Sequence, residues 1–190
     1  MREIAAEAGV SLGLAYRYFP SKEAFVLALY QQMAAETDQA ISQLPVGTVA
    51  ERFVLTMTAR LEQAAPHRDT FRALFSAIIA PNSRAELFGN EAESMRRRAE
   101  EAFITLVQTS TDAPKPDLVW AVGKLLYGAH FAVLLFWLRD QTMGQKATAS
   151  LLLFVRDLLP WLIRGLALPF VARELTRFVR IIDSAFGTTH

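Results

Sequence analysis

The sequence contains no cysteine, which excludes disulfide bonds and thiolate metal sites. It has only three histidines, and it shows no His-rich spacing, no phosphate-cradling glycine loop and no GxSxG segment. We therefore expect no metal, no cofactor and no enzymatic activity. The chain also lacks an excess of charge of one sign. The formal net charge of the 190 residues is +1, so no general electrostatic field draws the chain onto nucleic acid.

Long uninterrupted hydrophobic runs are also lacking, although hydrophobic residues make up 52% of the chain. The longest apolar run extends over 14 residues from Leu125 to Leu138 and is interrupted by His130, whereas a membrane-spanning helix needs about 20 apolar residues. The later run over 151–172 carries Arg156, Asp157 and Arg164. We therefore expect a cytoplasmic protein without a membrane partner, whose excess apolar surface is buried in an oligomer interface.

Apolar residues recur at three- and four-residue spacing and strict alternation is scarce, which predicts an all-α fold. The breaks follow glycine and proline. Pro160 lies inside an apolar helical pattern and is expected to kink or split that helix. The predicted helices are 2–8, 12–18, 21–43, 48–64, 67–79, 84–111, 116–140, 145–165 and 169–186.

Residues 1–25 predict a separate small module, because the helices there are very short and aromatic residues crowd at the end of the second one. Gly9 ends the first short helix, where a left-handed residue costs least. Ser11 is a favourable N-cap for the second helix. The residues expected to pack between the two helices are Ile4, Ala5, Ala8, Val10, Ala15 and Phe19. Two short helices joined by a tight turn that contains glycine form a helix-turn-helix.

The outer face of the second helix would then carry Ser11, Leu12, Gly13, Leu14, Tyr16, Arg17 and Tyr18. Apolar side chains there suit thymine methyl groups, while tyrosine hydroxyls and arginine suit phosphates. Lys22 falls in the first turn of the third helix, where backbone amides already favour an anion. By spacing alone, a DNA-binding surface and a protein-docking helix pair remain open, because helix-turn-helix geometry serves both.

The segment IAAEAGVSLGLAYRYFPSKEAF resembles the signature of the tetracycline-repressor (TetR) family of bacterial transcription regulators. The resemblance covers about the first 25 residues. It implies that Ser11 to Tyr18 form the recognition helix, that Tyr16, Tyr18 and Lys22 contact phosphates, and that 12–14 face the bases. Arg2 matches a position where some members contact DNA. Ala15 departs from the pattern, since the family more often has leucine there.

The family's DNA-binding module has three helices, and the first would precede residue 1, so the module in this chain is expected to be incomplete. The resemblance implies that 26–190 form a larger helical bundle for ligand sensing and dimerisation. Helices 116–140 and 145–165 are too apolar for one face of a monomeric helix. We therefore predict a homodimer through about 118–165 that binds a palindromic double-stranded DNA operator.

A small-molecule effector, apolar or aromatic in character, is expected among the middle helices. Its candidate contacts are Phe53, Met57, Phe71, Phe75, Phe103, Val107, Tyr127, His130 and Phe131. An ordinary apolar core would show the same pattern. The basic run 96–98 is interpreted as a solvated helix face, because it offers i,i+4 pairs with Glu100 and Glu101. The sequence thus predicts a ligand-responsive transcriptional regulator of the repressor type. The alternative is a helical ligand-binding or dimerisation protein that has lost DNA binding.

Overall fold

The computed structural model describes residues 1–69, 71–72 and 89–186, and within these ranges every regular element is a helix. The predicted all-α fold is therefore confirmed. The α-helices are α1 (Arg2–Glu7), α2 (Leu12–Tyr18), α3 (Lys22–Ser42), α4 (Val49–Ala64), α6 (Gly89–Gln108), α7 (Pro116–Arg139), α8 (Lys146–Gly165) and α9 (Pro169–Phe186). Short 3-10 turns occupy Ala65–His67 and Met143–Gln145.

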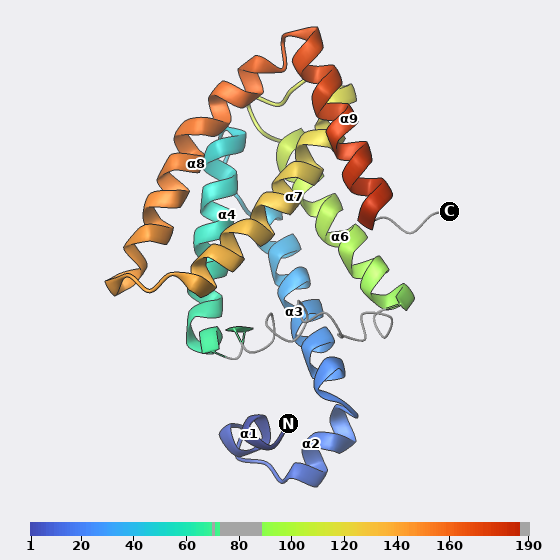
Figure 1. The fold of residues 1–190 in the computed structure, drawn as a ribbon, viewed down its shortest axis with the longest axis vertical. Coiled ribbons are helices and arrows are strands. Elements are labelled where there is room, and N and C mark those ends of the chain that lie inside the picture. Colours follow the sequence, from blue (N-terminus) through green and yellow to red (C-terminus); the bar gives the residue numbers. More distant parts are fainter. Residues whose placement is uncertain (70, 73–88, 187–190) are drawn as a thin grey trace.

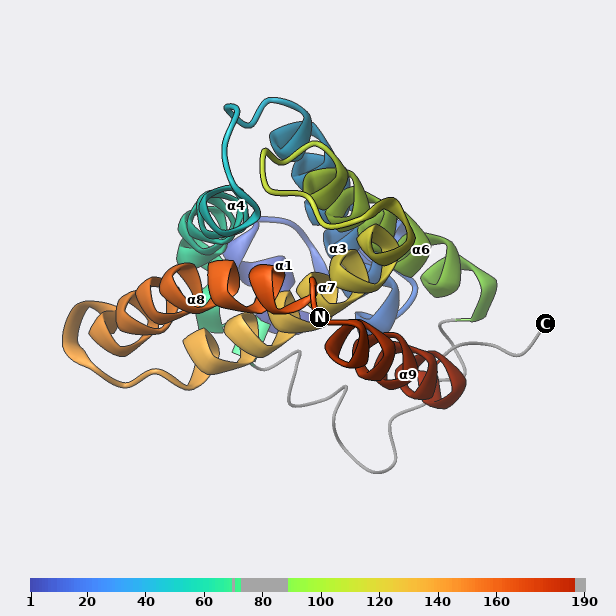
Figure 2. The ribbon, with the colours of Figure 1, turned by 90° about the horizontal axis from the view of Figure 1, so that it is seen from above.

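The molecule consists of a small module and a helical body that are connected by α3 (Figure 1). Helices α1 and α2 pack against each other, and α3 leads from them into the body, where it contacts α4 and α6. Helix α7 crosses the body and contacts α4, α6, α8 and α9. Helices α8 and α9 form an inverted V whose apex is the turn at 166–168, and seen from above they line the same side of the body (Figure 2).

The core lies where α4, α6 and α7 meet. Phe53 and Met57 of α4, Phe103 and Leu106 of α6, and Trp137 of α7 are all fully or almost fully buried. Burial of large apolar side chains is the main favourable term in folding, so this cluster anchors the body. Helix α7 would also suit a membrane span by length and composition, but half of its most apolar stretch is buried inside the bundle. A core helix has that same character.

Helix boundaries differ from the predicted ones at two places in the body. Pro160 was expected to kink or split its helix; helix α8 continues through it from Lys146 to Gly165, so a split does not occur. Helix α6 ends at Gln108 rather than at 111, because its last turn is closed by other groups: Arg52 Nη1 donates to the carbonyl of Leu106 at 2.9 Å and Ser110 Oγ donates to the same carbonyl at 2.7 Å. Of the predicted helix 67–79, residues 68–69 and 71–72 are helical. The remainder, like 84–88, lies outside the described residues.

A polar junction fixes the end of α7 to the start of α8. The Asp140 carboxylate accepts hydrogen bonds from the backbone N–H and hydroxyl of Thr142 (2.9 and 2.6 Å) and from those of Thr148 (2.8 and 2.7 Å). These four bonds hold the pKa of Asp140 well below its usual value. Arg68 Nη2 donates to the carbonyl of Trp137 at 2.6 Å and the guanidinium lies over the Trp137 ring. The C-terminus of α7, where the helix dipole favours a cation, is thereby closed.

Candidate nucleic-acid interface

The turn between α1 and α2 has the geometry that the sequence predicts. Gly9 has a φ of 66°, in the left-handed region that glycine adopts at low cost. Its N–H donates to the Ala6 carbonyl at 3.2 Å, and the Val10 N–H donates to the Ala5 carbonyl at 2.9 Å, which together form a Schellman motif. The Ser11 hydroxyl then accepts from the Leu14 N–H at 3.2 Å and caps α2. The helix-turn-helix is confirmed at the level of its turn and its cap.

The inner side of the module is small. Ala5 and Ala15 are buried, and Phe19 packs edge-on against Phe25 of α3 at 5.1 Å between ring centroids. Ala8 and Val10, which were expected to pack inside, are exposed, and that expectation is wrong. The physical reason is that α1 has only six residues and the chain reverses at Gly9, so that among the described side chains of α1 and α2 only Ala5 and Ala15 are buried. The side chain of Ile4 lies outside the described structure.

The outer face of α2 carries nearly all the residues predicted to bind DNA. Tyr18 is 71% exposed, Tyr16 49% and Leu14 39%, while Ala15 on the opposite side is only 7% exposed. The other predicted positions follow this division: Ser11, Gly13 and Arg17 are exposed, Leu12 is half-buried, and Arg2 is exposed on the neighbouring α1. The structure therefore places one continuous polar and aromatic surface on a single short helix.

Lys22 stands apart from this surface because it opens the next helix. It is the first residue of α3, whose N-cap is Ser21, and the Ser21 hydroxyl accepts from the Ala24 N–H at 3.1 Å. The Lys22 side chain lies outside the described structure, so only its backbone position is known. That position puts it in the first helical turn, where N–H groups favour a bound phosphate.

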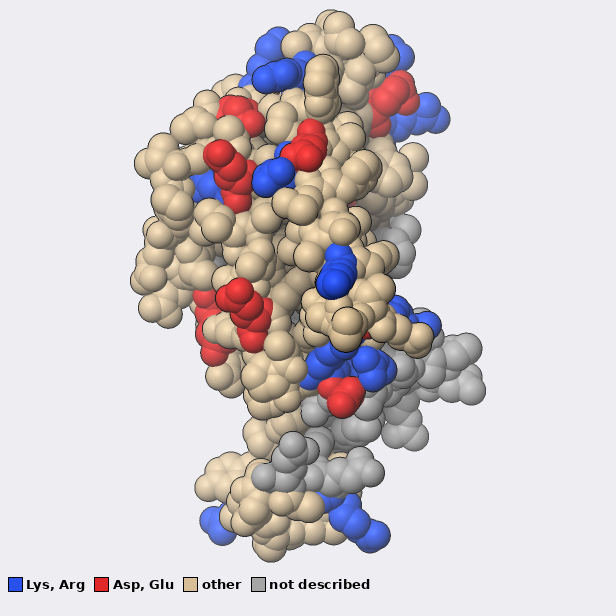
Figure 3. Space-filling view, turned by 90° about the vertical axis from the view of Figure 1, so that its left-hand side faces the viewer, with Lys and Arg blue, Asp and Glu red and all other residues tan. Residues whose placement is uncertain are grey.

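The module forms an end of the molecule away from the body. In Figure 3 the charged side chains visible on the lower, N-terminal module are basic, and uncharged surface separates them. By sequence, Arg2, Arg17 and Lys22 are balanced by Glu3, Glu7 and Glu23, so the module is neutral overall. Such a module would depend on shape and base edges as well as on phosphates.

Residues 1–29 match the model of the bacterial regulatory proteins of the tetR family. The N-terminal segment is thus similar to the DNA-binding module of that family. No curated protein in the comparison matches the chain. The TetR-family module comprises α1, α2 and the first turns of α3, which are the elements whose geometry is described above. The match supports a DNA-binding role for this module, and proteins of that family are transcriptional regulators.

The described residues that were predicted to contact an effector converge in the helical body. Phe53, Met57, Phe103, Val107 and His130 are not exposed at all. Phe71 is buried, Tyr127 and Phe131 are partly buried, and Phe75 lies outside the described residues. The rings form a chain of contacts with centroid distances of 6.1 Å for Phe53 to Phe103, 5.4 Å for Phe103 to His130 and 4.5 Å for His130 to Phe131.

Sequence reasoning did not find the buried cations of this region. Arg60 is only 5% exposed, and its positive charge helps to lower the pKa of His130. A signal was present: Arg60 follows Phe53 by seven residues and Met57 by three, so it shares their face of α4. It was not recognised because arginine is rarely buried.

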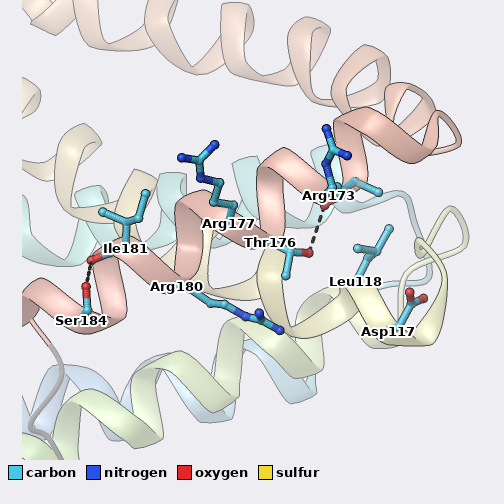
Figure 4. A pocket seen from close by; sticks show the side chains of 9 residues that line it. Asp117, Leu118, Arg173, Thr176, Arg177, Arg180, Ile181 and Ser184 are labelled. Atoms are coloured by element: carbon cyan, nitrogen blue, oxygen red, sulfur yellow. Dashed lines mark hydrogen bonds between the residues drawn. The ribbon is translucent and has the colours of Figure 1, made fainter.

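A hollow of about 580 Å³ lies elsewhere, between the start of α7 and the flank of α9 (Figure 4). It is lined by Asp117, Leu118, Ala172, Arg173, Thr176, Arg177, Arg180, Ile181 and Ser184, none of which was predicted as an effector contact. Figure 4 shows Arg173 and Arg177 directed away from α7. Because these guanidinium groups do not converge, the hollow is not a formed anion site.

The basic run at 96–98 has the solvated character that its spacing predicts. Arg96 pairs with Glu100 at 3.7 Å and Arg97 pairs with Glu101 at 3.9 Å. Glu100 also approaches Lys124 of α7, whose ammonium group binds both carboxylate oxygens of Asp183 in α9 at 2.8 Å. Arg96, through Glu100, therefore belongs to an ion network that connects α6, α7 and α9.

Proposed function

We propose that this regulator is a cytoplasmic repressor that binds a palindromic operator as a homodimer and is released by a small aromatic effector. In this proposal residues 1–25 form the DNA-binding module and 26–190 form the sensing and dimerisation domain. Helix α3 runs across that boundary and connects the two functions mechanically.

The observation that carries the DNA-binding role is the outer face of α2. This face is exposed, it is held by a capped and tightly turned backbone, and it projects from the body (Figure 1). Leu12 and Leu14 would meet base edges and thymine methyl groups, while Arg17 and Tyr18 would bind phosphates. Gly13 has no atom within 4 Å of where a Cβ would stand, so the backbone is open to close approach by a DNA groove.

Support for the homodimer comes from apolar residues left exposed on the last two helices. On α8, Leu153 (50% exposed) lies on another side of the helix, and the remaining exposed apolar residues are Phe154 (60%), Leu158 (38%), Trp161 (70%) and Leu162 (53%). They recur at intervals of four, three and one residues and form one stripe along the helix. Exposed apolar residues on α9 are Phe170, Phe178, Ile181 and Ile182. A surface of this kind marks an association site, and a two-fold dimer buries the same patch on both copies.

These exposures change the extent of the interface proposed from the sequence. The predicted segment 118–165 includes α7, but most of α7 is used in the core, where Leu126, Val133 and Trp137 are buried. Helix α9, which lies beyond that segment, exposes more apolar surface. We therefore propose that α8 and α9 form the dimer contact, with Leu135 and Phe136 of α7 at its margin.

The effector role is supported by the aromatic cluster of Phe53, Phe103, Tyr127, His130 and Phe131 in the middle of the body. An effector that binds one arrangement of α6 and α7 better than another would shift the dimer between DNA-binding and released forms. The alternative function, a helical ligand-binding protein without DNA binding, predicts the same structure for the body. It differs only in predicting that the outer face of α2 does not bind DNA.

The test measures binding of the purified dimer to labelled DNA from its own upstream region across a salt series. Arg17→Ala is expected to weaken binding and to reduce the slope of log affinity against log salt by about one unit, since one phosphate contact is lost. Tyr18→Phe removes a single hydroxyl and should weaken binding with little change in slope. Val46→Ala, at a loop residue that is 89% exposed, serves as the matched control.

If Arg17→Ala and Tyr18→Phe bind as the control does, the assignment of α2 to DNA is wrong. If the chain binds an aromatic ligand but no DNA under any salt condition, the alternative function replaces the proposal. Circular dichroism of each variant shows whether a loss of binding comes from the surface itself or from unfolding.

A further inference from the structure

His130 is the one histidine among the described residues that lies wholly inside the body. Its relative exposure is 0%, and three rings surround it: Phe131 at 4.5 Å, Phe103 at 5.4 Å and Tyr127 at 5.9 Å between centroids. In such apolar surroundings each polar atom requires a hydrogen-bond partner, because water is absent to supply one. The two ring nitrogens of His130 differ in this respect.

The position of the proton on the imidazole follows from its neighbour. Nδ1 lies 3.2 Å from the Tyr127 carbonyl oxygen, which only accepts, so Nδ1 carries the hydrogen. Burial in the core, and secondly the charge of Arg60, hold the pKa of His130 well below its usual value. The ring is therefore neutral, and Nε2 presents a bare lone pair. Among the described residues Nε2 has no hydrogen-bond partner.

We infer that Nε2 of His130 is the acceptor for a hydroxyl group on an aromatic effector, and that the effector class is phenolic. The lone pair requires a donor, and the rings of Phe103 and Phe131 provide flat apolar surfaces against which an aromatic ring stacks. The positive charge of Arg60 disfavours an ammonium donor at this place, which leaves a neutral hydroxyl as the donor. A phenol meets all three conditions.

A buried water is the competing occupant of this lone pair. An internal water typically makes about three hydrogen bonds to buried polar groups. Phe103 and Phe131, the rings nearest to the imidazole, offer such a water no partner. A phenol needs only the single polar contact at Nε2, because the rest of its surface is apolar.

This inference rests on the proposed effector function and specifies the chemistry of the ligand. Its test uses the full chain without DNA and two probes that share one ring system, 2-naphthol and its methyl ether. The wild type is expected to bind 2-naphthol at least about tenfold more tightly than the ether, because the ether cannot donate to the buried acceptor. Titration calorimetry measures both affinities.

The variant His130→Phe keeps a ring in the cluster and removes the acceptor, so it should bind the two probes equally. A wild type that shows no preference between the probes overturns the inference. Nitrogen NMR of the histidine side chains provides a readout that needs no variant. The spectrum should show a protonated Nδ1 and a bare Nε2 whose resonance shifts when 2-naphthol is added. A protonated Nε2, or one that 2-naphthol leaves unchanged, contradicts the inference.

Operator binding separates this inference from the proposed function. If 2-naphthol binds with the expected preference but leaves the DNA complex intact, the His130 site stands and the proposed release mechanism fails. If the methyl ether binds as well as 2-naphthol and releases DNA equally, effector control stands and the phenolic assignment is wrong.

Discussion

Gly123 lies where α7 crosses α6 with no space for a side chain. A Cβ atom at this position would stand 2.6 Å from Ile104 Cγ1, 2.7 Å from Ile104 Cα and 2.9 Å from Ile104 N. Two of these three atoms belong to the backbone of α6, so no side-chain rotation relieves the overlap. The variant Gly123→Ala must therefore push the two helices apart or distort one of them.

The expected magnitude follows from two opposing terms. Overpacking of a close core contact costs about 1–3 kcal/mol, and a backbone neighbour places this site near the upper end. Alanine gains about 1 kcal/mol over glycine in the middle of a helix. The net expectation is a loss of about 2 kcal/mol in the free energy of unfolding. For a urea m-value of about 2 kcal/mol/M, the unfolding midpoint would fall by about 1 M.

The chain offers a matched control on the same helix. At Gly128 of α7 no atom lies within 4 Å of the position that a Cβ would occupy. Gly128→Ala should therefore raise the free energy of unfolding by about 1 kcal/mol, the helix preference of alanine over glycine, without a clash. Both variants are unfolded in urea at the same protein concentration, because the proposed dimerisation would make the midpoint concentration-dependent. If Gly123→Ala unfolds at or above the wild-type midpoint, the α6–α7 crossing is not as close as this reasoning requires.

Two further predictions concern the apolar stripe and the α7–α8 junction. Trp161→Glu should turn the proposed dimer into a monomer in analytical ultracentrifugation, because Trp161 lies in the apolar stripe. The control Leu153→Glu, at a residue exposed on another side of α8, should remain dimeric. If both variants have the same oligomeric state, the stripe is not the dimer contact. Asp140→Asn should lower stability at neutral pH, because Thr142 and Thr148 donate to the carboxylate. Because the pKa of Asp140 is lowered in the folded protein, its ionisation stabilises the fold fully only above the ordinary pKa of aspartate. The difference in stability between Asp140→Asn and the wild type should therefore shrink below about pH 4. Urea midpoints at several pH values measure this difference.

The sequence predicts the helices of this protein well because their signals are local. Pro116 at the first position of α7 and the capping Ser11 of α2 are both used as their residue types suggest. Pro160 shows the limit of that reasoning. A proline removes one backbone donor, yet Leu152 and Leu159 of α8 are buried against the body, and this packing holds the helix together across it.

The tertiary contacts could not be predicted in the same way. Arg52 closes the end of α6 and Arg68 closes the end of α7, each from a helix or turn that is distant in the sequence. An arginine in an amphipathic pattern is normally assigned to the solvent face, so nothing local distinguishes these two from exposed ones. For the same reason the sequence identifies the outer face of α2, which is local, more completely than the surroundings of His130, which three helices assemble.

Within the described part of the chain, α3 is the element that connects the body to the module, so we expect the proposed coupling between the aromatic cluster and α2 to act through it. This helix is continuous from Lys22 to Ser42, and its body end packs against α6, the helix that carries Phe103 of the cluster. Its 21 residues give a length of about 31 Å. A rotation of about 5° at the body end would therefore move the module end by about 3 Å. In a dimer the two displacements occur together, whereas the half-sites of an operator are fixed about 34 Å apart. Under the proposed function, a small rearrangement of α6 around a bound effector would thus be sufficient to misplace the α2 helices of both protomers.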